Sequence, residues 1–262
     1  MEVHHHSHHP KKWKEYITEF LMLFLAVSLG FLAENLRENF VEKEREHELA
    51  KSLYNELKAD STDLAKIIAF RLKKENYLNY LYENYKGDIA QDSIQKTYQV
   101  ALYIGVNSNS SIIFEPRNAI IHQLESSGMM RYFKESELQA DLHDIINAAE
   151  KVKMRTQREI DLYMQFVLPQ YIQYQDLDLT RILTQKGHSK ESLNDVFENY
   201  LVSKDYYKTP KRNLSPDLFN KMIRSFEFYR FVLSSTRGNQ LAHYQKASTK
   251  LLQDLRANYK FN

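Results

Sequence analysis

The sequence predicts an all-α protein, in which a single N-terminal transmembrane helix continues into a stalk helix and then a helical bundle of long helices. Two observations lead to this fold class. The run Phe20–Ala33 (FLMLFLAVSLGFLA) is uncharged and mostly apolar, and nothing like it recurs along the chain. The whole chain has only six glycines and five prolines, and apolar residues recur at helical spacing over long stretches, a pattern typical of helix. No alternating apolar and polar run with turn residues predicts a sheet.

The residues around the apolar run extend it to the length of a membrane span. A bilayer core needs about 20 helical residues, and the run alone is short. Trp13 and Tyr16 are residue types favoured at the membrane interface, so residues 13–33 form a segment about 31 Å long at 1.5 Å per residue. The Leu, Phe and Val side chains of the run together favour insertion by roughly 4 kcal/mol. We therefore predict a transmembrane helix over residues 13–35.

A cleaved signal peptide is the main alternative, because basic, apolar and small residues follow one another in the order that such peptides show. Cleavage after Ala33 would place Phe31 where a small residue is required, and no Pro or Gly breaker follows Ala33. Retention of the helix is therefore favoured. The lysines before the span predict a cytoplasmic N-terminus in the inner (cytoplasmic) membrane. In a Gram-negative cell the C-terminal domain would lie in the periplasm, and the absence of cysteine is compatible with that compartment.

One stripe of the span suits helix packing inside the membrane. Glu19, Ala26, Gly30 and Ala33 share a face of a 3.6-residue helix, and the small residues allow a second helix to approach closely. Glu19 on this stripe could face a cation of the partner helix. The alternative is that Glu19 lies at headgroup depth beside the lysines and that the small residues coincide by chance.

We expect a charged stalk helix over residues 36–60 and a periplasmic bundle over residues 61–262. Glu and Lys or Arg alternate along the stalk, and pairs four residues apart would stabilise a solvated helix. Leu36, Phe40, His47, Leu53 and Leu57 recur there at loose helical spacing. A parallel coiled coil with copies of the chain is the functional alternative, but too few apolar positions are present to assign heptads.

The bundle sequence predicts several helices with recognisable ends. The stalk should continue to Lys86-Gly87, where glycine ends a helix. Its apolar stripe contains Leu57, Leu64, Ile67, Ile68, Leu72, Leu78, Leu81 and Tyr85. A shorter helix is expected over residues 92–104, followed by a loop over residues 105–111. Pro116 should occupy the first position of the next helix, which ends at residues 126–128.

Two more long helices are expected in the C-terminal half. Ser136 and Gln139 have the spacing of a capping box and should open a helix that Pro169 ends or kinks. Residues 189–202 predict a shorter helix. Ser215-Pro216-Asp217 combines an N-cap, a first-turn proline and a favourable negative charge. The final helix should run from there towards Ala257, with Gly238 as a possible interruption.

Three segments of the chain resemble an uncharacterised group of single-pass inner-membrane proteins from Bacteroidota. They are the His-rich start leading into KKWKEYITEFLMLFLAVSLGFLAENLRE, then HELAKSLYNELKADSTDL, and the central AIIHQLESSGMMRYFKESELQADLHDII. The match covers about a third of the chain, and the anchor segment is its most specific part. The resemblance implies an inner-membrane location and a helical periplasmic domain, and it implies no catalytic residues.

The only metal-like cluster lies in the predicted cytoplasmic tail, residues 1–12. His4, His5, His6, His8 and His9 could chelate Zn, Ni or Cu when unprotonated. An affinity tag is one alternative, although tags seldom contain the interrupting serine. We expect a weakly metal-binding tail with no firm metal site.

No other motif predicts a cofactor or a reaction. Glu44 and His47 form one Glu-x-x-His step, whereas a di-iron bundle needs two. Four further histidines lie singly: His122, His143, His188 and His243. The sequence has no zincin, nucleophile-elbow or phosphate-loop motif. The basic patch Lys208, Lys211 and Arg212 could dock an acidic partner, but a solvated loop explains it equally.

These observations predict a non-enzymatic, membrane-anchored helical scaffold, sensor or assembly protein without a cofactor. Its expected partners are the lipid bilayer and another protein or copies of the chain, bound through the transmembrane and stalk helices. The balance of 36 basic and 34 acidic residues gives no nucleic-acid footprint. The alternative is an accessory subunit of a membrane transporter, channel or secretion complex that packs through the transmembrane helix.

Overall fold

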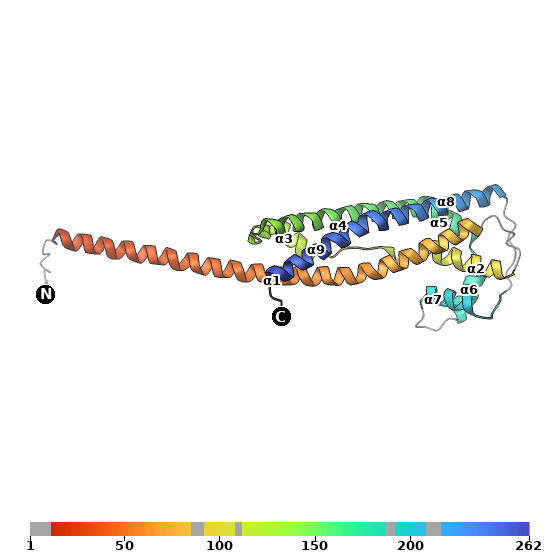
Figure 1. Ribbon diagram of the computed structural model, residues 1–262, viewed down its shortest axis with the longest axis horizontal. Helices are drawn as coiled ribbons and strands as arrows, with labels where there is room; N and C mark the ends of the chain where they lie inside the picture. Colours follow the sequence, from red (N-terminus) through yellow and green to blue (C-terminus); the bar gives the residue numbers. More distant parts are fainter. Residues whose placement is uncertain (1–11, 85–91, 108–111, 187–191, 208–215, 262) are drawn as a thin grey trace, which may run out of the picture. The chain divides into compact units, whose positions relative to one another are not determined.

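The computed structural model describes residues 12–84, 92–107, 112–186, 192–207 and 216–261 (Figure 1). All regular secondary structure in these ranges is helical. The predicted all-α fold class is therefore confirmed. The chain divides into two compact units, Met1–Lys51 and Ser52–Asn262, and the first helix, α1 (Trp13–Glu83), contributes residues to both.

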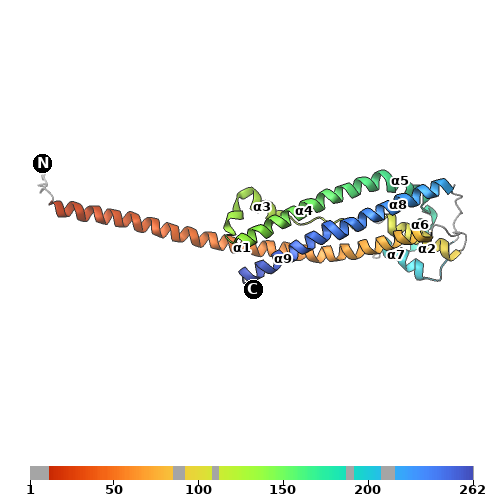
Figure 2. The same cartoon turned by 45° about the horizontal axis from the view of Figure 1, so that its top comes forward.

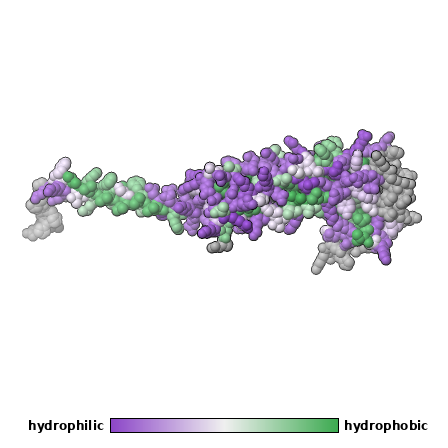
Figure 3. All heavy atoms as spheres, in the orientation of Figure 1, coloured by the Kyte–Doolittle hydropathy of each residue, from purple (hydrophilic) through white to green (hydrophobic). Residues whose placement is uncertain are grey.

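In the first unit, the described residues lie almost entirely in α1. This helix includes a stretch that is long and apolar enough to cross a membrane, and none of that stretch is buried. Phe20, Leu23 and Phe31 leave 65%, 69% and 70% of their surface exposed. Figure 3 shows the stretch as a continuous apolar segment between hydrophilic ends. The segment predicted to span the membrane is therefore helical, and the described residues leave its apolar surface uncovered.

The second unit is built on helices that run side by side along most of its length. Figures 1 and 2 show α4 (Ser136–Leu162), α8 (Pro216–Thr236) and α9 (Ala242–Asn258) beside the second half of α1. Their facing stripes form a core of large aliphatic side chains, each stabilising the fold by about 1.5–3 kcal/mol when fully buried. The fully buried members include Leu53, Leu57, Leu64, Leu142, Ile145, Val152, Leu251 and Leu255.

Short helices close one end of this unit. They are α2 (Asp92–Leu102), α5 (Leu168–Tyr174), α6 (Leu177–Lys186) and α7 (Leu193–Val202). A satellite core joins α2, α6 and α7 around Tyr103 and Phe197, whose rings stack with centroids 3.6 Å apart. The helix α7 begins with a capping box between Ser192 and Asp195, so it starts later than the predicted residue 189.

One predicted helix start is wrong, and one predicted cap does not form. Pro116 lies in an extended segment, and the next helix, α3 (Ala119–Ser127), begins three residues later. Ser136 is the first residue of α4, but no side-chain cap forms there; Gln139 Nε2 instead donates to Phe133 O at 2.6 Å. The predicted stop after Ser127 is confirmed, because Gly128 ends α3 with φ +67°, a backbone conformation that favours glycine.

Three π-helical turns interrupt the described helices: η2 (Tyr103–Asn107), η5 (Tyr163–Val167) and η6 (Arg237–Leu241). One of them differs from a predicted boundary, and the other two lie where a kink or an interruption is predicted. Gly105, expected in a loop, lies inside η2, where a Cβ would come within 3.3 Å of the Leu78 backbone nitrogen. Pro169 follows η5, and Gly238 lies within η6, so both mark a change of helical register rather than an end.

Candidate functional site

The predicted packing stripe of the span lies on α1 as expected. Glu19, Ala26, Gly30 and Ala33 are all exposed. A side chain added at Gly30 would meet no atom within 4 Å, so this face has room for a neighbouring helix. Whether the stripe packs against another helix stays a prediction.

None of the histidine candidates is confirmed as a metal site. The tail containing His4, His5, His6, His8 and His9 lies outside the described residues, as does the basic patch at Lys208, Lys211 and Arg212. Within the described ranges, no group of three or more His, Asp or Glu side chains is placed to hold a metal ion. His122 and His243 each face one carboxylate, with His243 Nε2 3.2 Å from Asp144 Oδ1.

The first polar cluster of the second unit is a buried ion pair that sequence reasoning missed. Arg71 on α1 and Glu159 on α4 are almost fully buried, and Arg71 Nη2 donates to Glu159 Oε2 at 2.6 Å. Arg71 also donates to two backbone carbonyls, at 3.0 Å to Ile112 and 3.4 Å to Leu233. The planar guanidinium therefore joins α1 to α4, to α8 and to the segment after η2. Each contact gives a hydrogen-bond partner to a buried polar group, which would otherwise destabilise the fold.

Lys74 lies one turn further along α1 and is completely buried. Its Nζ donates to Val106 O at 3.1 Å, a carbonyl in the last turn of η2, where helices lack internal donors. The ammonium also lies 5.4 Å from the ring centroid of Tyr229 and 6.0 Å from that of Tyr163. Burial, followed by the nearby charge of Arg71, lowers the pKa of Lys74 to about 7, and Glu159 partly opposes this shift.

A second ion pair extends the cluster towards η6. Glu75 is almost buried and accepts two hydrogen bonds from Arg237, both at 2.9 Å. This bidentate geometry is the strong form of the Arg–carboxylate interaction. The cluster of Arg71, Lys74, Glu75, Glu159 and Arg237 thus joins α1 to the π turns or to helices next to them. Its buried groups bind other parts of the chain, which is the arrangement of a structural core and not of an open catalytic site.

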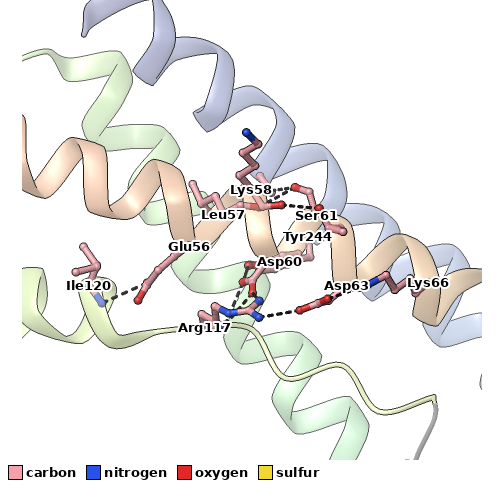
Figure 4. A network of polar contacts seen from close by, with 12 residues as sticks. Glu56, Leu57, Lys58, Asp60, Ser61, Asp63, Lys66, Arg117, Ile120 and Tyr244 are labelled. Carbon is pink, nitrogen blue, oxygen red and sulfur yellow. Dashed lines mark hydrogen bonds and ion pairs between the residues drawn. The ribbon is translucent and has the colours of Figure 1, made fainter. Parts of the chain in front are cut away.

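A second polar cluster, which we name the Asp60 clamp, surrounds the buried carboxylate of Asp60 on α1 (Figure 4). Asp60 Oδ1 accepts from Arg117 Nη1 at 2.7 Å, and Oδ2 accepts from the Arg117 backbone N–H at 3.0 Å. Tyr244 on α9 donates its hydroxyl to Oδ2 at 2.6 Å. Burial, with this hydrogen bond, raises the pKa of the Tyr244 hydroxyl, which therefore stays protonated as a donor. The clamp holds the extended segment and α9 against α1.

Two neighbouring carboxylates on α1 complete the clamp. Asp63 Oδ2 accepts from Arg117 Nη2 at 2.8 Å, and this hydrogen bond lowers the pKa of Asp63. Glu56 Oε2 accepts from the backbone N–H of Ile120 at 3.3 Å, in the first turn of α3. Burial raises the pKa of Glu56. These contacts fix the course of residues 114–120 against α1.

The segment that the clamp fixes forms one wall of a surface groove, which we name the α4 groove. It has a volume of about 390 Å³ and lies between the extended segment, α3 and α4. Apolar side chains from all three elements line its floor: Phe114, Ile121, Ile146, Ala149 and Ile160. Its polar lining includes Glu115, Glu125, Glu150 and Lys153. The groove is open to solvent, unlike the two buried clusters.

Comparisons with protein-family models, with curated proteins and with solved structures find no match. The Bacteroidota resemblance therefore stays a prediction. What the structure establishes is the coarser statement: an all-helical protein with one long apolar helix near its N-terminus.

The Asp60 clamp predicts a large stability loss when its central carboxylate is removed. Asp60→Ala should lower the free energy of unfolding by about 3 kcal/mol, because it leaves the Tyr244 hydroxyl and the Arg117 backbone N–H buried without an acceptor. Urea unfolding of the detergent-solubilised protein, followed by circular dichroism, measures the effect. Asp63→Ala is the control and should change little, because Asp63 is 42% exposed and binds only side chains. Equal losses in both variants would contradict the central role of Asp60.

Lys74 predicts a stability that rises with pH. Its folded pKa, about 7, lies below the ordinary lysine value of 10.5, so between these values the unfolded chain binds one proton more than the folded chain. Stability therefore increases across this window, by up to about 1.4 kcal/mol per pH unit. Below pH 7 both states are protonated and this contribution to the slope disappears.

The comparison with Lys74→Met isolates this contribution. Unfolding free energies measured from pH 6 to 9 should climb more steeply in the natural protein than in the Met variant. Lys66→Met, which removes a lysine that is 75% exposed, should keep the steeper slope. Parallel curves for the natural protein and Lys74→Met would show that Lys74 keeps an ordinary pKa in the folded state.

Proposed function

We propose that this protein is a non-enzymatic, membrane-anchored helical protein that scaffolds, senses or assembles other proteins at a membrane surface. The observation that carries the proposal is the apolar stretch of α1, which is long enough to span a bilayer and is nowhere buried by the described chain. Such a surface is unfavourable in water and needs lipid or another protein around it. The lipid bilayer is the partner that its length fits best.

The proposed topology follows from charge. Lys11, Lys12 and Lys14 precede the span, and lysines are enriched on the cytoplasmic side of membrane helices. The N-terminus would be cytoplasmic in the inner membrane, and the second unit would be periplasmic. The absence of cysteine throughout the chain means that an oxidising compartment would impose no disulfide pairing.

The polar chemistry of the second unit supports a role in binding and not in catalysis. Its buried charged side chains contact backbone carbonyls, aromatic rings and one another, as in the contacts of Arg71, Lys74 and Asp60. A catalytic constellation needs such groups to face a place where a substrate can lie. The described clusters are used to join helices, so the surfaces of the helices are the parts left for partners.

A second candidate is an accessory subunit of a membrane complex such as a transporter, channel or secretion system. The observation that favours it is the exposed stripe of Glu19, Ala26, Gly30 and Ala33 on α1. Small residues four positions apart allow close backbone approach between membrane helices. The same stripe could also join copies of this chain, with the helix continuing the contact beyond the membrane.

Fractionation and labelling test the membrane proposal. The full chain should stay in the membrane pellet after a carbonate wash, and deletion of residues 13–35 should release it to the supernatant. Because the chain has no cysteine, Met154→Cys gives a single label site on an exposed position of α4. A membrane-impermeant maleimide should label it in spheroplasts without lysis. Recovery of the intact chain in the aqueous fraction would contradict the proposal, and labelling only after lysis would reverse the topology.

The stripe predicts an effect of bulk at Gly30. Gly30→Leu should weaken self-association, or association with a partner subunit, in a bacterial two-hybrid assay, because it fills the space that a second helix would use. Ser28→Leu adds similar bulk about 200° around the same helix and serves as the control. Equal signals from the two variants would show that the stripe does not mediate packing.

A further inference from the structure

We infer that the α4 groove binds a basic, amphipathic peptide segment of a partner protein. This inference rests on the proposed function and deepens it, because it assigns a docking surface and gives the chemistry of what docks there.

The floor of the groove suits apolar side chains. Phe114 and Ile121 leave only 2% and 4% of their surface exposed, while Ile146, Ala149 and Ile160 are partly exposed along one face of α4. From Ile146 to Ile160 this face is about 21 Å long at 1.5 Å per residue. A volume of about 390 Å³ spread along that length accepts several side chains of an elongated segment. Apolar grooves of this kind bind one face of an amphipathic peptide.

The rim of the groove carries more negative than positive charge. Glu115 comes from the extended segment, Glu125 from α3 and Glu150 from α4, whereas Lys153 is the one lysine or arginine of the lining. Among the residues that the structure describes, Glu115 and Glu150 have no ion-pair partner, and Glu125 has only His122, at 4.0 Å. Carboxylates from three elements thus surround the apolar floor. This arrangement is complementary to a segment with apolar residues on one side and Lys or Arg on the other.

The walls of the groove are held before any partner arrives. The Asp60 clamp fixes the backbone at Arg117, and Glu56 holds the backbone of Ile120 at the start of α3. Thr156 and Ile160 of the groove lie on α4 close to Glu159, three residues before it and directly after it, and the buried Arg71–Glu159 pair holds this part of α4. A preformed groove binds without the cost of ordering its own walls. The clamp therefore has a role beyond stability, because it shapes the surface next to it.

The test uses the full-length protein in a neutral detergent and a fluorescent peptide of alternating leucine and lysine, with a leucine–glutamate peptide as the charge-reversed probe. Fluorescence anisotropy should detect binding of the lysine peptide and not of the glutamate peptide. Glu115→Gln combined with Glu150→Gln should weaken binding about tenfold. Glu38→Gln combined with Glu42→Gln makes the same change in net charge outside the groove and should leave binding unchanged.

A steric variant separates the groove from general charge attraction. Ala149→Phe fills the floor and should abolish binding, while a thermal unfolding curve close to that of the natural protein confirms that the variant is folded. The inference is overturned if the lysine peptide does not bind, if the glutamate peptide binds equally, or if both double variants weaken binding to the same extent. These outcomes leave fractionation unaffected, so failure here is distinguishable from failure of the membrane proposal.

Discussion

The second unit depends on charged side chains that lie on the buried seam of α1. Asp60, Arg71 and Lys74 are fully or almost fully buried, and a buried charge is costly unless partners surround it. Their partners come from η2, α4, α9 and the extended segment. A different arrangement of these elements would leave at least one charge without a partner. The polar seam therefore selects one packing among the many that a purely apolar stripe would allow, which we regard as its main contribution to the fold.

This seam also explains what sequence reasoning could and could not predict. The apolar stripe through Leu57, Leu64, Leu78 and Leu81 is correct, since all four residues are buried. Ile67, Ile68 and Leu72 were expected to complete it, but Leu72 is 41% exposed and its neighbour Arg71 takes the inward position. Asp60 lies three residues after Leu57, Lys74 lies four residues before Leu78, and Arg71 lies seven residues from both Leu64 and Leu78. All three therefore share the buried stripe of the helix. A charged residue within an apolar stripe is the sequence signal that could have identified the clusters. A search for the periodicity of apolar residues alone does not detect it.

Local signals predict helix starts at Pro116 and Ser136. Ser136 does begin α4, although its predicted cap does not form, whereas a tertiary contact decides the conformation at Pro116. The backbone N–H after Pro116 donates to Asp60, which keeps this segment extended against α1. Gln139 reaches Phe133 instead of a capping residue. The π turns are a further case, because a one-residue change of register leaves almost no trace in composition. The α4 groove could not be predicted either, because its three walls meet only through long-range packing.

The contrast between the inside and the outside of the molecule bears on function. In the first unit, none of the described residues covers the apolar surface of α1. In the second unit, the buried charges of Asp60, Arg71 and Lys74 are engaged with other parts of the chain. The accessible parts of the second unit are its helix faces. The α4 groove lies on this surface and has an apolar floor surrounded by carboxylates from three elements. These two surfaces are the basis of the proposed scaffold role, in which lipid would cover the apolar stretch of α1 and a partner of complementary charge would cover the α4 groove.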